Sequence, residues 1–120
     1  MALDTAKLVE DIDSMDAQAF VSNLSEDCVL RYANHPEVHG REAIAGAIGA
    51  FYETIAGLTH RPTNEWTDGP TSILQFEVTY TRHDGGTVTV PAVSIVRANG
   101  ELIDDYRIYV DLAPVYAPAG

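Results

Sequence analysis

The chain has 120 residues, of which 46% are hydrophobic and 21% are charged, a composition typical of one folded domain with its own core. Eighteen acidic residues against seven basic ones give a net charge of −11. The length and composition predict a single domain over residues 1–120. Because so negative a surface repels phosphate groups and anionic lipids, we expect no nucleic-acid partner.

The N-terminal stretch MALDTAKLVEDIDSM is acidic where a secretory signal would be basic and then apolar. No stretch of the chain is apolar over the length that is needed to cross a bilayer. The single cysteine, Cys28, excludes a disulfide within the chain, and its place beside Leu30 predicts a buried, unreactive thiol. We therefore expect a cytoplasmic protein that does not bind membranes.

Residues 4–24 have the pattern of a helix broken into two pieces. Leu8, Ile12 and Met15 have helical spacing, and Asp16 is placed to cap the second piece. Residues 27–34 then read as a strand, followed by the turn HPEVHG.

The next stretch, REAIAGAIGAFYETIAG, repeats its apolar residues with helical spacing. Its apolar face consists of Ile44, Ile48, Phe51 and Ile55. Gly57 is the expected end of this helix, because glycine readily adopts the left-handed conformation that terminates helices.

After residue 57 the pattern changes to strands. Four candidates are LTHRPTNEW, SILQFEVTYTR, TVTVPAVSIVR and ELIDDYRIYVDL, separated by the hairpin-type turns TDGP, HDGG and ANG. The tail APVYAPAG is rich in proline and alanine, so we expect it to be irregular. Helices that precede an antiparallel meander predict an α+β fold with the helices packed on one face of a curved sheet.

Alternation along each strand predicts which side chains face the core. In the second candidate these are Leu74, Phe76, Val78 and Tyr80, and in the last they are Leu102, Tyr106, Ile108 and Val110. In the first candidate they are Leu58, His60, Pro62, Asn64 and Trp66. Proline cannot donate to a strand ladder, so Pro62 predicts an edge strand or a bulge, beyond which the alternation can shift.

Several polar side chains fall on this predicted core face. Tyr32 and Asn34 stand two residues apart and share the face of Cys28 and Leu30, and His60 joins them from the next strand. Polar groups on a core face must find partners or line a wet cavity. Their occurrence on different strands favours a small-molecule pocket over a solid core. A structural role remains open for each, with His60 donating to a buried carbonyl and Asn34 shaping a turn.

Metal and nucleotide sites lack support in the sequence. The one pair of histidines with i, i+4 spacing, His35 and His39, falls in the turn HPEVHG and not on a helix, there is no CxxC motif, and no Gly-rich phosphate-binding loop is present. We expect no metal and no cofactor.

The GREAI helix start, the DG hairpin and the YRIYVD ending give the chain a family resemblance. Over roughly residues 5–116 the sequence resembles the SnoaL-like branch of the nuclear-transport-factor-two-like superfamily. The resemblance implies a cone-shaped barrel, in which a strongly curved, mostly antiparallel sheet wraps around the N-terminal helices and leaves an apolar pocket. It also implies homodimers that pair through the outer sheet face. The superfamily includes ketosteroid isomerases, polyketide cyclases, limonene-epoxide hydrolases and non-catalytic proteins, so the fold alone does not assign a function.

The Y-x-N-x-P pattern at Tyr32, Asn34 and Pro36 resembles the epoxide-hydrolase motif in which Tyr and Asn help to hold the attacking water. That family also needs an Asp-Arg-Asp set, and here its positions fall on residues that do not supply it. These are Phe76 and Val78, or Glu77 and Thr79 in the other register, together with Ile108.

The other two activities of the superfamily are matched only in part. The base of a ketosteroid isomerase would fall near Arg31 or Tyr32 and its second Asp near Val93. Polyketide cyclases of the family use an Asp and a His. By alternation Asp111 points outward, which leaves His60 as the candidate.

We therefore expect a cofactor-free pocket that binds a small hydrophobic carbonyl or polyketide-like compound and isomerises or cyclises it by proton transfer. His60 is the expected general base, and Tyr32 and Asn34 are the expected donors to the enolate oxygen. The expected substrate-binding residues are Trp66, Phe76, Val78, Tyr80, Val93, Tyr106 and Ile108. Two alternatives stay open, a non-catalytic module that binds hydrophobic ligands and an epoxide-hydrolase-like enzyme with another base.

Overall fold

The computed structural model describes residues 3–117 and confirms the α+β class. The helices are α1 (Thr5–Asp13), α2 (Ala17–Val21), α3 (Arg41–Glu53) and the short α4 (Ala113–Tyr116). The strands are β1 (Leu24–Tyr32), β2 (Val38–His39), β3 (Gly57–Asp68), β4 (Thr71–Thr81), β5 (Thr87–Asn99) and β6 (Leu102–Val110).

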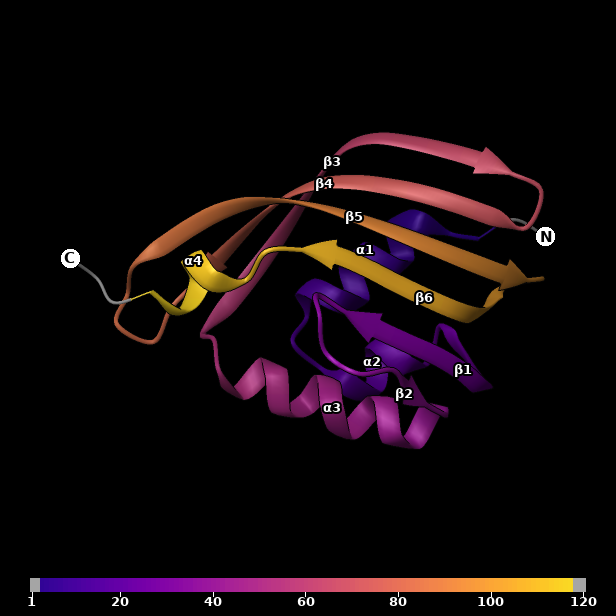
Figure 1. Cartoon of the computed structure of the whole chain (residues 1–120), viewed down its shortest axis with the longest axis horizontal. Coiled ribbons are helices and arrows are strands. Elements are labelled where there is room, and N and C mark those ends of the chain that lie inside the picture. The colour runs from indigo at the N-terminus through magenta and orange to yellow at the C-terminus, as the bar shows by residue number, and fades with distance from the viewer. Residues whose placement is uncertain (1–2, 118–120) are drawn as a thin grey trace.

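Within residues 3–117 the strands form one six-stranded sheet in the order β2-β1-β6-β5-β4-β3. Neighbouring strands are antiparallel except β1 and β6, which run parallel. Figure 1 shows β3, β4 and β5 as long strands that bend along their length, with α1, α2 and α3 against one face of the sheet. Among the described residues, no helix is long and apolar enough to cross a membrane.

The predicted break between the first two helices is confirmed. Asp16 caps α2 by accepting hydrogen bonds from the backbone amides of Gln18 and Ala19, at 3.0 and 3.4 Å. The predicted end of α3 at Gly57 is wrong, because the helix ends at Glu53. The backbone amide of Ala56 already donates to the carbonyl of Thr81 at 2.8 Å, so the chain has joined the sheet before Gly57 is reached.

A bulge in β3 changes which residues face the helices. Pro62 pairs with Phe76, but Asn64 pairs with Gln75, so Thr63 has no partner of its own and the alternation reverses. Trp66 consequently lies opposite Ile73 on the outer face, with 51% of its surface exposed. The bulge predicted at Pro62 is confirmed, whereas the prediction that Asn64 and Trp66 face the core is wrong.

A second bulge lies at the start of β6. Arg97 pairs with Asp105 but Ala98 pairs with Ile103, which leaves Asp104 as the extra residue. Ile103 is therefore buried and Leu102 is 39% exposed, the reverse of what simple alternation predicts.

The C-terminal tail is more ordered than its composition suggests. Residues 113–116 form α4, and Val115 is buried in the core. The prediction of an irregular tail is thus wrong for this part, while residues 118–120 lie outside the described range. The predicted burial of Cys28 is confirmed, and burial raises the pKa of its thiol to about 12.

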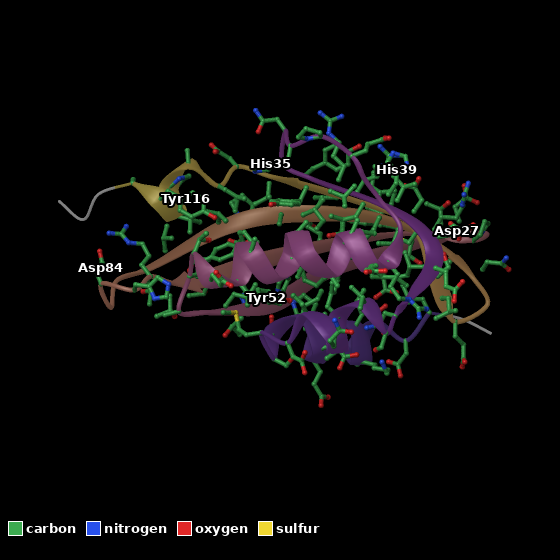
Figure 2. All side chains as sticks on the ribbon, turned by 90° about the horizontal axis from the view of Figure 1, so that it is seen from below. Asp27, His35, His39, Tyr52, Asp84 and Tyr116 are labelled. Atoms are coloured by element: carbon green, nitrogen blue, oxygen red, sulfur yellow. The ribbon has the colours of Figure 1, made fainter. Side chains whose placement is uncertain are left out.

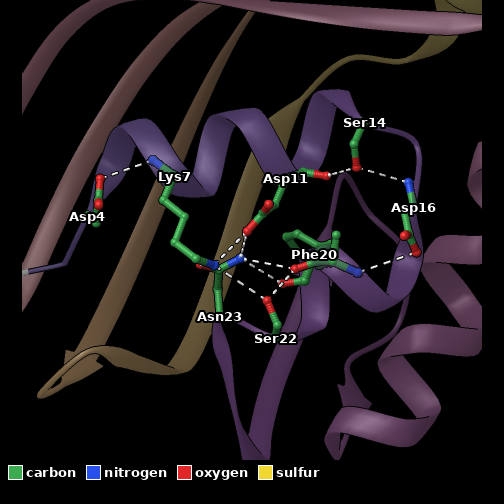
Figure 3. A network of polar contacts seen from close by, with 9 residues as sticks. Asp4, Lys7, Asp11, Ser14, Asp16, Phe20, Ser22 and Asn23 are labelled. Carbon is green, nitrogen blue, oxygen red and sulfur yellow. Dashed lines mark hydrogen bonds and ion pairs between the residues drawn. The ribbon is translucent and has the colours of Figure 1, made fainter.

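A polar network ties α1 to the segment that enters β1 (Figure 3). The side-chain amide of buried Asn23 donates to a carboxylate oxygen of Asp11 at 3.0 Å and to the carbonyls of Ala19 and Phe20 at 3.3 and 3.1 Å. The ammonium of Lys7 donates to Asn23 at 3.2 Å and to Asp11 at 2.7 Å. Asn23 thus holds the two short helices and the start of β1 in a fixed arrangement.

Replacing Asn23 with alanine should lower the free energy of unfolding by about 1–3 kcal/mol, because the three hydrogen bonds donated by this buried side chain are lost. Lys7→Ala is the matched control and should cost less than about 1 kcal/mol, since Lys7 is exposed. Urea denaturation of both variants measures the difference. An Asn23 variant as stable as the Lys7 variant would show that the network contributes little.

Candidate functional site

A cavity of about 60 Å³ lies between the helices and the inner face of the sheet. Six aromatic side chains line it, from Phe20, Tyr32, Phe51, Tyr52, Tyr80 and Tyr106. Aliphatic side chains complete it, with the Ser94 hydroxyl and the His60 imidazole as further polar groups.

Asp13, the last residue of α1, holds His60 of β3 by two hydrogen bonds. One carboxylate oxygen lies 2.7 Å from Nδ1 of the His60 ring, and the other accepts from the His60 backbone amide at 3.0 Å. The side chains of His60 and Asp13 are 12% and 23% exposed. The carboxylate therefore orients the imidazole at the cavity wall.

The partner of Nδ1 decides which nitrogen can act as a base. A carboxylate only accepts hydrogen bonds, so the neutral ring carries its proton on Nδ1 and leaves Nε2 unprotonated. The ring also packs edge-on against Phe76, with 5.0 Å between centroids and an interplanar angle of 90°. Contacts on several sides thus fix the ring and leave one nitrogen free to accept a proton.

The phenols around the cavity differ in what they can still bind. The Tyr52 hydroxyl donates to the backbone carbonyl of Ile12 at 2.9 Å, so its proton is already engaged. Burial raises the pKa of Tyr80 to about 12, and burial together with nearby Tyr116 raises the pKa of Tyr32. Tyr32 and Tyr80 are therefore neutral hydrogen-bond donors at physiological pH.

The structure brings many of the predicted site residues together. The cavity is lined by Tyr32, His60, Val78, Tyr80, Tyr106 and Ile108. Phe76 is buried beside His60, where it supports the ring.

Asn34 and Val93 do not lie where the strand pattern places them. β1 ends at Tyr32, and Ala33 has a φ of 52°, so the chain turns and leaves Asn34 exposed outside the cavity. Val93 pairs with Gln75 and Tyr109 on the outer face, and its neighbours Ala92 and Ser94 face the cavity. Together with Trp66 on the outer face, these are corrections to the predicted site.

Sequence reasoning missed Asp13, Tyr52 and Ser94. Asp13 lies 47 positions from His60, and nothing in the local pattern links them. Tyr52 follows Ile48 by four residues on the buried face of α3, a spacing that could have indicated it. Within residues 3–117, no cluster of three or more His, Cys, Asp or Glu side chains is suited to hold a metal ion.

The geometry predicts opposite tautomers for two histidines. Neutral His60 should carry its proton on Nδ1, whereas His83 should carry it on Nε2, which lies 2.8 Å from the carbonyl of Glu53. Nitrogen-15 chemical shifts at a pH where both rings are neutral measure this directly. In Asp13→Ala the His60 ring should lose its Nδ1 preference while His83 stays unchanged. An Nε2-protonated His60 in the unaltered protein would contradict the assignment.

The fold is shared with many solved structures of low sequence identity. A hypothetical protein with a ketosteroid isomerase-like fold from Catenulispora acidiphila, in complex with trimethylamine, is 17% identical with a TM-score of 0.83, and the match covers 91% of this chain and 85% of that one. A candidate SnoaL-like polyketide cyclase from Jannaschia sp. CCS1 is 16% identical with a TM-score of 0.81, covering 96% and 90%. An LEH-like epoxide hydrolase from M. tuberculosis is 13% identical with a TM-score of 0.76, covering 90% and 80%.

A search of curated protein sequences gives no significant match. The SnoaL-like domain family, in contrast, matches residues 5–106, most of the chain. Together with the helices, the sheet order and the cavity between them, this match shows that the chain belongs to the SnoaL-like domain family.

Proposed function

We propose that this protein is a cofactor-free enzyme that isomerises or cyclises a small hydrophobic carbonyl compound by proton transfer. The observation that carries the proposal is the His60 ring, held by Asp13 at the wall of an apolar cavity. A positioned imidazole with one unprotonated nitrogen is well suited to accept a proton from a carbon acid.

In this mechanism Nε2 of His60 removes a proton from the carbon next to the carbonyl. The Asp13 carboxylate stabilises the imidazolium that forms, in the manner of acid–histidine pairs in other enzymes. Tyr32 and Tyr80 line the same cavity and donate to the developing enolate oxygen. The proton then returns to a different carbon in an isomerisation, or the carbanion attacks a second carbonyl in a cyclisation.

The cavity lining also restricts the charge of the ligand. Within the described residues, no lysine or arginine lines it, and aromatic faces attract cations. A neutral ligand or one with an amine fits this wall better than a carboxylate. The Catenulispora acidiphila protein of the same fold is in complex with trimethylamine, which agrees with this preference.

A second candidate function is ligand binding without catalysis. It is favoured by the position of Asn34, which lies outside the cavity. Without this predicted amide donor, only phenols remain to stabilise an enolate. Epoxide hydrolysis has less support. Val78 and Ile108, which occupy positions of the Asp-Arg-Asp set, present only hydrocarbon to the cavity.

We also propose that two copies pair through the outer sheet face. Trp66, Ile73 and Ile95 are neighbours in one cross-strand row on β3, β4 and β5. Although the net charge of −11 opposes association, two acids on the neighbouring strand β6 are paired with arginines. Arg107 lies 2.9 Å from Asp105, and Arg97 lies 2.9 Å from Asp104.

His60→Gln should abolish isomerisation or cyclisation of a panel of aryl and alkyl ketones, because glutamine cannot act as a base. Asp13→Asn should lower the rate by roughly 10²–10⁴-fold, the scale of lost acid–base catalysis. His39→Gln, at an exposed histidine outside the cavity, is the matched control and should keep the full rate. Proton exchange measured by NMR gives the rates. Ligand binding that shifts the thermal midpoint without turnover in the unaltered protein would instead favour the binding role, and diol formation from epoxides would favour the hydrolase.

A substitution at Trp66 tests the proposed pairing of two copies. Trp66→Lys should weaken dimerisation at least tenfold, because it replaces the largest apolar side chain of the row with a charge. Leu102→Lys changes an exposed hydrophobic residue at the end of a strand, away from the row, and should leave association unchanged. Sedimentation equilibrium measures both. A monomeric parent protein at high concentration would contradict the proposal.

A further inference from the structure

A second hollow opens at the surface beside the cavity. Its volume is about 620 Å³, and it lies between the turn that follows β1 and the junction of β6 with α4. Its polar lining includes Asn34 and His35 from the turn and Asp111 and Tyr116 from the junction. Figure 2 shows His35 and Tyr116 on the same side of the molecule.

The hollow and the cavity share a wall. Val110 and Leu112 line both of them, so the two spaces meet at these aliphatic side chains. The rings of Tyr32 and His35 form a second part of this wall, with 4.5 Å between their centroids. Tyr32 lines the cavity and His35 lines the hollow.

The turn that carries Asn34 is held in place by its own contacts. The backbone amide of His35 donates to the carbonyl of Tyr32 at 3.2 Å, and Nε of Arg31 donates to the carbonyl of His35 at 3.0 Å. The turn therefore fixes where the Asn34 side chain leaves the backbone.

On the opposite side of the hollow, α4 is anchored at two points. Val115 is buried in the core, and the Tyr116 hydroxyl lies 2.9 Å from Oγ1 of Thr54 at the end of α3. Tyr116 is also close enough to Tyr32 and Tyr80 to raise the pKa of both phenols. The phenol of Tyr116 thus stands where the cavity meets the surface.

We propose that this hollow is a second subsite, which binds the polar end of a ligand whose apolar end passes Leu112 to reach the cavity. The proposal rests on the ligand-binding role of the cavity proposed above. The amide of Asn34, the imidazole of His35 and the phenol of Tyr116 suit a hydroxyl or amine group. The carboxylate of Asp111, with no lysine or arginine among the described lining residues, disfavours a carboxylate or phosphate on the ligand. The preferred substrate is therefore an elongated ketone with a hydroxyl or amine at its far end.

Three ligands test the subsite by isothermal titration calorimetry. They are propiophenone and its para-substituted analogues with a 3-hydroxypropyl or a 2-carboxyethyl chain. The hydroxypropyl ketone should bind about tenfold more tightly than propiophenone, the scale of one or two new hydrogen bonds. The carboxyethyl ketone should gain nothing. Asn34→Ala should remove most of the gain and leave propiophenone binding unchanged, and Asn99→Ala, at the far end of β5, should change neither.

A second pair of variants tests the shared wall. Leu112→Ala shortens a side chain at which the two spaces meet and should speed association of the hydroxypropyl ketone several-fold, measured by stopped-flow fluorescence. Val115→Ala shortens a buried side chain of the same segment that lines neither space, so it controls for general loosening. Equal effects of the two variants would show that loosening, not the wall, controls access.

Calorimetry measures binding and not turnover, so the subsite and the catalytic role can be refuted independently of each other. Propiophenone that binds but is never converted would refute the catalytic role and leave the subsite to be judged by the chain-length comparison. Equal affinity for the two uncharged ketones, or an equal loss for both in Asn34→Ala, would overturn the subsite. If none of the ketones binds, the cavity is no ligand site and the subsite proposal falls with it.

Discussion

The double hydrogen bond between Asp13 and His60 is the contact on which the proposed site depends. It joins the end of α1 to β3, so one carboxylate both fastens the helix layer to the sheet and fixes the tautomer of the imidazole. Both oxygens of Asp13 are used on the same residue, on its backbone and on its ring. Such a tether resists rotation as well as displacement, which a base needs if its free nitrogen is to stay aimed at a bound carbon acid.

The aromatic wall sets the conditions under which this pair works. Burial keeps the phenols of Tyr32 and Tyr80 protonated, so they add hydrogen-bond donors without adding charge. The cavity is lined mostly by apolar side chains, which strengthens the attraction between the Asp13 carboxylate and any positive charge that develops on His60.

The sequence predicts the fold well and the site only in part, and the reasons are local. Alternation assigns the inner face of β4 correctly because that strand contains no irregularity, as Phe76, Val78 and Tyr80 show. It fails at Trp66 because the bulge after Pro62 reverses the faces, and it fails at Asn34 because Ala33 turns the chain out of the strand. Asp13 could not be found from periodicity, since its partner is distant in sequence and close only in the folded chain.

The parallel pairing of β1 with β6 has a consequence for folding. Leu30 lies beside Tyr106, so these central strands meet only after more than half of the chain has been brought back on itself. Closing so long a loop is entropically costly, and contacts of this kind slow folding. Until β6 docks, β1 and β5 each present an open edge to other chains in the cell. Newly made molecules should thus be most prone to aggregate during this interval, before their last strand fills the gap.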